Sequence, residues 1–181
     1  GDFVEELFIA STHDYMLVFL TSGRMHWLKV YDVPSMARTS KGRAIVNLLE
    51  MPADEKICAV VAVRQFDSRF LVTATRGGQI KKTPLEAYSN PRRGGIQATG
   101  LAEGDEVVGV AITTGNDEIV LATADGKAIR FKETDVRPMG RTAAGVRGVH
   151  LRQGDQVVDM AIVDPGATLL TVCENGYGKR T

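Results

Sequence analysis

A short turn that ends in glycine recurs four times along the 181 residues at a nearly constant spacing. It reads Ser22-Gly23, Gly77-Gly78, Asp125-Gly126 and Asn175-Gly176, and successive glycines are 55, 48 and 50 residues apart. An apolar run of strand character precedes each turn, and a basic–apolar alternation follows the first three. Asp-Gly and Asn-Gly supply the positive φ that a two-residue hairpin turn requires. The sequence therefore predicts four β-hairpins within an internal repeat.

Two further markers keep this period. The short segments Asp54-Glu55-Lys56-Ile57, Asp105-Glu106-Val107-Val108 and Asp155-Gln156-Val157-Val158 each lead into an apolar strand, and Gly1-Asp2-Phe3-Val4 fits as an earlier copy. The strands expected from this marker span residues 4–10, 57–63, 107–112 and 157–163. A basic loop containing glycine is the third marker, and a short strand is expected after each loop, ending at Leu49, Leu101 and Leu151.

One repeat is thus predicted to hold three antiparallel strands, a basic loop and a fourth strand. The expected repeats span approximately 1–53, 54–103, 104–153 and an incomplete 154–181, which gives three complete four-stranded units and a partial one. Residues 84–88 and 132–136 are expected to form short turns at most. Four-stranded units at this period indicate an all-β, propeller-like fold in which neighbouring units must stack to bury their apolar faces.

Composition excludes several classes of protein. No apolar run approaches the ~18 residues that a membrane span needs, and the acidic residues 1–6 do not resemble a signal peptide. Cys58 and Cys173 match no metal or redox spacing, so we interpret them as reduced core residues. These features predict a cytoplasmic protein without a membrane segment.

No catalytic constellation is visible. His13, His26 and His150 fall at unrelated places in the repeat and have no recurring cysteine or carboxylate beside them, so no metal site is expected. The glycine-rich stretches precede no helix and lack a Gly-Lys-Ser/Thr motif, which argues against a nucleotide-binding loop. We therefore expect no cofactor and no enzymatic activity in this chain.

The basic loops carry the functional prediction. Arginine guanidinium groups match phosphate oxygens, and glycines allow backbone N–H groups to come close to them. The formal net charge is zero, but stacking would bring one loop per unit to the same edge, with the acidic residues on the other side. Such an edge suits duplex DNA that is bound through its backbone. The predicted contacts are Arg38, Lys41, Arg43, Arg92, Arg93, Gly94, Gly95, Arg141 and Arg147, with Lys81 and Lys82 widening the band.

Two other functions are compatible with a propeller-like fold. Basic residues in turns are usually only solvated, so a scaffold that binds proteins remains an alternative. A propeller enzyme that processes sugars or metabolites would need carboxylates or histidines at a common repeat position, and none is found.

Three segments resemble the C-terminal domain family of DNA gyrase A subunits. Pro91-Arg92-Arg93-Gly94-Gly95-Ile96-Gln97 is similar to a degenerate form of that family's box, whose usual form is Gln-Arg-Arg-Gly-Gly-Lys-Gly. Glu174-Asn175-Gly176-Tyr177-Gly178-Lys179-Arg180-Thr181 and Ala144-Gly145-Val146-Arg147-Gly148-Val149 are similar to stretches typical of the same family. The second of these segments adds Lys179 and Arg180 to the predicted contacts.

This resemblance implies a β-pinwheel, a propeller-like disc whose blades exchange strands and whose basic perimeter wraps double-stranded DNA. It also implies two protein partners, the remainder of the gyrase A subunit plus the gyrase B subunit, with the module supporting ATP-dependent negative supercoiling without catalysing it. Pro91, Ile96 and Gln97 depart from the box. The related domain of topoisomerase IV, which lacks a clear box, is therefore an alternative.

Overall fold

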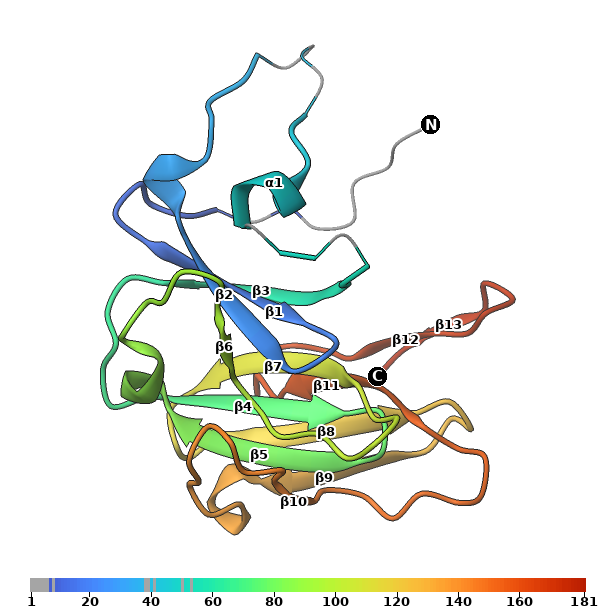
Figure 1. The fold of residues 1–181 in the computed structure, drawn as a ribbon. Helices are drawn as coiled ribbons and strands as arrows, with labels where there is room; N and C mark the ends of the chain where they lie inside the picture. Colours follow the sequence, from blue (N-terminus) through green and yellow to red (C-terminus); the bar gives the residue numbers. More distant parts are fainter. Residues whose placement is uncertain (1–6, 8, 38–39, 41, 50, 53) are drawn as a thin grey trace.

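Four antiparallel β-sheets account for nearly all the regular structure of the chain (Figure 1). The computed structural model describes residues 7, 9–37, 40, 42–49, 51–52 and 54–181. In Figure 1 the first sheet lies above the second and third sheets, which overlap in that view. The all-β, propeller-like prediction is confirmed.

The first two sheets have four strands each. The first has the order β3-β1-β2-β6, and its strands are β1 (Tyr15–Leu20), β2 (Arg24–Lys29), β3 (Ile57–Val63) and β6 (Ile96–Gln97). The second has the order β10-β5-β4-β7, and its strands are β4 (Phe70–Thr75), β5 (Gln79–Pro84), β7 (Val107–Thr113) and β10 (Val146–Arg147).

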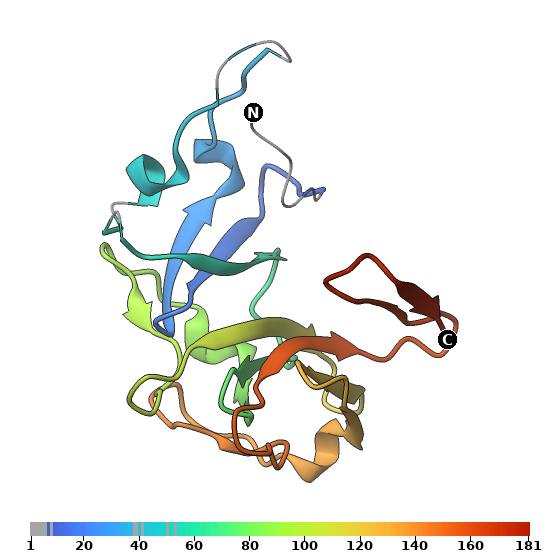
Figure 2. The ribbon, with the colours of Figure 1, turned by 90° about the vertical axis from the view of Figure 1, so that its right-hand side faces the viewer.

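The other two sheets are smaller. The third contains β8 (Glu118–Thr123), β9 (Ala128–Lys132) and β11 (Val157–Ile162) in the order β11-β8-β9. The fourth is the hairpin of β12 (Leu170–Val172) and β13 (Gly178–Arg180), which stands apart from the other sheets in Figure 2. The described residues thus form two four-stranded sheets rather than the three predicted.

Each four-stranded sheet is assembled from strands of consecutive repeats. The hairpin β1–β2 pairs with β3 along one edge and with β6 along the other, although β6 begins 67 residues after β2 ends. The hairpin β4–β5 accepts β7 and β10 in the same way. Strand exchange between neighbouring units therefore links the sheets covalently.

The hairpin turns are one residue longer than predicted. In the first hairpin Phe19 pairs with Met25, which leaves Thr21, Ser22 and Gly23 as a three-residue loop between the strands. The amide of Gly23 donates to the carbonyl of Leu20 at 2.9 Å, and Gly23 has a φ of 78°. A type I turn followed by a left-handed glycine has this geometry. The other three hairpins repeat it at Gly78, Gly126 and Gly176.

Two apolar clusters hold the first three sheets together. Leu17, Phe19 and Met25 of the first sheet pack against Leu71 and neighbouring residues of the second. The opposite face of the second sheet, including Val72 and Ile80, packs against the third. Because side chains alternate along a strand, β4 supplies residues to both clusters.

The segment after the first basic loop departs from the prediction. The short helix α1 (Ile45–Leu49) replaces the strand expected to end at Leu49. Its equivalents β6 and β10 each pair with a hairpin that precedes them by one repeat, and the described residues contain no hairpin before Tyr15. Leu49 and Met51 are instead buried against the outer face of the first sheet.

Other details also differ from the expectations. Leu7, Ile9 and Ala10 are not in a strand, and the rest of the predicted strand 4–10 lies outside the described residues. Short turns of 3₁₀ helix follow three hairpins: η2 (Leu85–Tyr88) and η3 (Glu133–Asp135) lie where short turns were predicted, whereas η1 (Val30–Asp32) was not predicted. Cys173 is exposed rather than in the core, and Cys58 is half-buried. Within the described ranges, no helix is long and apolar enough to cross a membrane.

Candidate nucleic-acid interface

The loop before β6, residues 91–95, is called here the Arg92 loop. Arg92 and Arg93 are exposed on it. The amide of Gly95 donates to the carbonyl of Arg92 at 3.0 Å and closes the turn. Arg24 of β2 reaches across and donates from Nη2 to the carbonyl of Gly94 at 2.8 Å. Three guanidinium groups therefore belong to one surface feature, and Arg24 is a member that the sequence alone did not identify.

The two glycines of this loop have different roles. Both have a positive φ, 80° at Gly94 and 75° at Gly95. A Cβ on Gly95 would lie 2.6 Å from the carbonyl oxygen of Met25, whereas a Cβ on Gly94 would meet nothing within 4 Å. Gly95 thus allows the exchanged strand to approach β2, and only Gly94 is free on its outer side to adjoin a ligand.

The loop before β10, residues 140–145, is called here the Arg141 loop, and it has the same construction. Gly145 has a φ of 96°, and a Cβ there would lie 2.5 Å from the carbonyl oxygen of Ile80. Arg141 is half-buried at the start of the loop, and exposed Arg147 follows it on β10, opposite Gln79. The repeat therefore places arginines in or beside the corresponding loops of two successive sheets, although not at matching positions, because Arg147 pairs with β5 as Gln97 pairs with β2.

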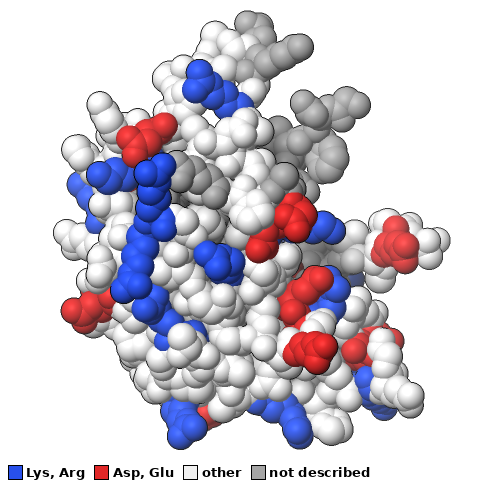
Figure 3. Space-filling model, viewed as in Figure 1, with Lys and Arg blue, Asp and Glu red and all other residues white. Residues whose placement is uncertain are grey.

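Charge is distributed unevenly over the surface despite the net charge of zero. In Figure 3, Lys and Arg side chains gather in a stripe at the left, on the side where β6 and the Arg92 loop lie in Figure 1. Most Asp and Glu side chains visible in that view lie to the right. Segregation of this kind gives a neutral protein a locally positive field.

Lys81 and Lys82 do not belong to this surface, contrary to the prediction. Lys81 is 1% exposed and Lys82 is 4% exposed. Lys81 Nζ donates to the carbonyls of Ala98 and Arg141. Lys82 Nζ donates to the carbonyl of Glu133 at 3.1 Å and lies 3.7 Å from its carboxylate. Both ammonium groups are directed into the interior and are unable to reach a phosphate.

Burial lowers the pKa of two groups near the loops. The pKa of Lys81 is lowered to about 7 by burial, with a further contribution from the nearby charge of Arg141. His26 lies beneath the Arg92 loop, and burial, followed by the charge of Arg24, lowers its pKa. Glu55 and the backbone at Leu49 act in the opposite direction on His26.

The remaining predicted contacts are not gathered with the two loops. Arg43 is exposed just before α1, near the top of Figure 1, while Lys179 and Arg180 are exposed on the separate hairpin. Arg38 and Lys41 lie outside the described residues. Among the described residues, the structure therefore brings together the predicted loop residues of the second and third repeats.

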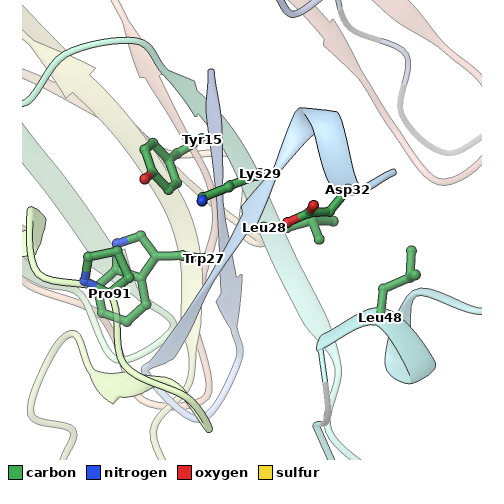
Figure 4. A pocket seen from close by; sticks show the side chains of 7 residues that line it. All are labelled: Tyr15, Trp27, Leu28, Lys29, Asp32, Leu48 and Pro91. Carbon is green, nitrogen blue, oxygen red and sulfur yellow. The ribbon is translucent and has the colours of Figure 1, made fainter. Parts of the chain in front are cut away.

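A pocket adjoins the Arg92 loop on the first sheet (Figure 4). Its walls include the aromatic rings of Tyr15 and Trp27, the ammonium group of Lys29 and the ring of Pro91. The indole Nε1 of Trp27 donates to the carbonyl of Tyr88 at 2.8 Å, which fixes that ring. Within the described part of the chain, no group of three or more His, Cys, Asp or Glu could hold a metal ion. The pocket thus offers one cation, Lys29, and one carboxylate, Asp32, beside aromatic and apolar side chains.

Known proteins share both the sequence and this fold. The family model described as "DNA gyrase C-terminal domain, beta-propeller" matches residues 14–64, 69–114 and 117–164. The DNA gyrase A subunit of Klebsiella oxytoca is 49% identical over 181 residues, which cover 99% of this chain and 21% of that protein. The chain thus spans about a fifth of the length of the curated relatives it matches.

Two solved structures have the same architecture. The C-terminal domain of DNA topoisomerase IV superposes with a TM-score of 0.85 at 29% identity, covering 93% of this chain and 53% of that one. The DNA gyrase A C-terminal domain superposes with a TM-score of 0.78 at 26% identity, covering 94% and 55%. Of these two structures, the topoisomerase IV domain has the higher TM-score. The matching family model and the 49% identical relative, in contrast, are both gyrase proteins. Since the family model covers most of the residues, this chain belongs to the family of DNA gyrase C-terminal domains and has their β-pinwheel fold.

Proposed function

We propose that this chain is a non-catalytic module that binds duplex DNA and bends it along a basic edge. In the cytoplasm, the module acts with the rest of the gyrase A subunit, together with the gyrase B subunit, to support ATP-dependent negative supercoiling by DNA gyrase. The observation that carries the proposal is the recurrence of arginines in or beside the Arg92 and Arg141 loops, on one side of a molecule with no net charge: Arg92, Arg93 and Arg147 are exposed and Arg141 is half-buried.

The contacts available at this edge suit phosphate oxygens. Each guanidinium group can donate two parallel hydrogen bonds to a phosphate. Arg24, Arg92 and Arg93 come from one loop and its neighbouring strand, and Arg141 and Arg147 come from the next. Two successive arginine clusters can contact phosphates along the DNA backbone rather than the edges of a few bases. The binding should therefore show little sequence preference.

The topoisomerase IV domain is the second candidate, favoured by its TM-score of 0.85. Both candidates bind DNA in this proposal, and they differ in the parent enzyme. A test is to replace the corresponding domain of a gyrase A subunit with this chain. If the chain is a gyrase module, the hybrid should introduce negative supercoils into relaxed plasmid with ATP. If it is a topoisomerase IV module, the hybrid should show relaxation and decatenation alone.

DNA binding itself is tested by fluorescence anisotropy on a labelled duplex at several salt concentrations. If about four to six phosphates are neutralised, log K should fall against log salt with a slope of about −4 to −5. Changing Arg92 and Arg93 together to alanine should flatten that slope by about one to two units.

A matched control removes the same charge from another place. Lys56 and Arg152 are exposed cations that stand next to acidic residues in the turns before β3 and β11. Changing both to alanine should alter the slope far less than the Arg92/Arg93 change. Equal losses from both double variants, or no loss from either, would contradict a localised DNA-binding edge and favour a protein-binding scaffold.

A further inference from the structure

The buried ammonium group of Lys81 lies between two segments that belong to different sheets. Ala98 directly follows β6, the strand that completes the first sheet after the Arg92 loop. Arg141 begins the loop that leads to β10 of the second sheet. Lys81 Nζ donates to the carbonyl of Ala98 at 2.7 Å and also to the carbonyl of Arg141. One side chain thus joins the backbone near both basic loops.

Neighbouring contacts show how closely these segments approach. The amide of Gly100 donates to the carbonyl of Ala143 at 3.1 Å. A Cβ on Gly100 would lie 2.6 Å from the carbonyl oxygen of Thr142. The hydroxyl of Tyr88 donates to the same Ala98 carbonyl at 3.1 Å, so this oxygen accepts two hydrogen bonds. The Arg141 loop therefore rests on the segment after β6 with Lys81 beneath the contact.

We propose that Lys81 is a positioning residue for DNA binding: its buried ammonium group holds the backbone of the Arg141 loop against the segment after β6, so that the two arginine clusters are presented at a fixed separation. The inference rests on the proposed DNA-binding function. It gives a role to a cation that the sequence pattern assigned to the surface.

An apolar side chain would be expected at this depth if packing were the sole requirement. Burying a charged group is unfavourable unless hydrogen bonds compensate it. At the same distance from the turn glycine, the first hairpin carries His26, which is also buried and lies directly under the Arg92 loop. A nitrogen-bearing side chain thus lies under each basic loop. Fixing a binding loop before it meets its ligand reduces the entropy lost on binding.

The decisive experiment is a double-mutant cycle between Lys81 and the arginines that it positions. In the parent chain, changing Arg141 and Arg147 to alanine should weaken binding to a labelled duplex by about tenfold. In a Lys81→Met chain, the same two changes should cost about threefold or less, because the loop no longer holds the arginines in place. If Lys81→Met does not fold, Lys81→Gln takes its place, since it keeps an N–H donor without the charge.

Thr113→Val is the matched control. It also removes a buried hydrogen bond of the second sheet, from Thr113 to the carboxylate of Glu133 at 2.7 Å, but this bond does not involve the Arg141 loop. The tenfold cost of the arginine changes should persist in this variant. A full tenfold cost in the Lys81→Met chain would overturn the inference, since Lys81 would then stabilise the fold without positioning the arginines.

A measurement without DNA separates this inference from the proposed function. Hydrogen exchange at the amides of Gly100 and Ala143 should accelerate at least about tenfold in Lys81→Met and remain unchanged in Thr113→Val. A parent chain that does not bind DNA would contradict the proposed function. Unchanged exchange at both amides would contradict the positioning role, whatever the chain binds.

Discussion

The interface between the first and second sheets and the interface between the second and third use one repeat position in different ways. In both, the fourth residue after the turn glycine reaches the 3₁₀ turn of the following sheet. Trp27 donates from its indole to the carbonyl of Tyr88 at 2.8 Å, whereas Lys82 donates from its ammonium group to the carbonyl of Glu133 at 3.1 Å. The repeat thus preserves the direction of the side chain and the backbone acceptor, but not the chemistry of the donor.

The second interface contains a charged network that the first lacks at this position. The carboxylate of Glu133 is fully buried and accepts hydrogen bonds from Thr113 Oγ1 at 2.7 Å and from the amides of Gly115 and Asp117 at 3.0 and 3.2 Å. Lys82 supplies the opposite charge and lies 4.9 Å from the centre of the Phe70 ring. Every carboxylate oxygen therefore has a partner, as a buried charge requires.

The largest expected difference follows from this charge. Lys82→Met leaves the buried carboxylate of Glu133 without its cation and should lower the free energy of unfolding by about 3–5 kcal/mol. Urea denaturation followed by circular dichroism measures this loss. Changing Glu133 to glutamine in the same chain should recover part of it, because the remaining group is neutral. No recovery would show that packing of the Lys82 stem, and not its charge, stabilises the second interface.

The contrast also explains which features the sequence could predict. The four turn glycines and the hairpin strands that flank them depend on local chemistry, and the structure has them, together with exposed arginines at 92, 93 and 147. Lys81 and Lys82 were predicted to widen the basic band because they follow the turn glycine in a basic–apolar run. Their acceptors come from residues 98, 133 and 141, so burial became favourable through partners that local patterns do not show.

Strand exchange was predicted from the family resemblance alone, because local residue patterns do not show it. The pairing of β6 with β2 depends on a glycine, Gly95, that allows close approach to Met25, and the sequence shows the glycine but not its neighbour. The segment after the first basic loop forms α1 instead of a strand, and local residue patterns do not show this difference either. Arg24 was overlooked because its partner, Gly94, is 70 residues away.

An intermediate effect is expected from the first interface, where the buried cation Lys81 meets carbonyl oxygens instead of a carboxylate. Its pKa is about 7 in the folded chain, against an ordinary value of 10.5 when exposed. Below pH 7 both states are protonated, and the cost of burying the charge is fully present. Between pH 7 and 10.5 the unfolded chain binds the additional proton, so stability should rise with pH.

Urea denaturation at pH 7 and pH 9 measures this rise. One pKa unit corresponds to about 1.4 kcal/mol, so the parent should gain about 2 kcal/mol over this interval relative to Lys81→Met. Comparing the two chains cancels the titration of other groups. Parallel pH profiles for both chains would mean that Lys81 retains its proton when buried, with the two carbonyls compensating its charge.

The smallest effect is expected at Trp27, the neutral counterpart of Lys82. Trp27→Phe removes the hydrogen bond to the Tyr88 carbonyl but keeps an aromatic ring, so the free energy of unfolding should fall by about 1 kcal/mol. Trp27 is half-buried and lines an open pocket, so water can reach the vacated acceptor. Tyr31→Phe, at an aromatic ring that is 78% exposed, is the control and should change stability by less than about 0.5 kcal/mol. If Trp27→Phe lowered the free energy of unfolding as much as Lys82→Met, the hydrogen bond from one sheet to the 3₁₀ turn of the next would matter more than the charge of its donor. The two interfaces would then be equivalent in energy as well as in geometry.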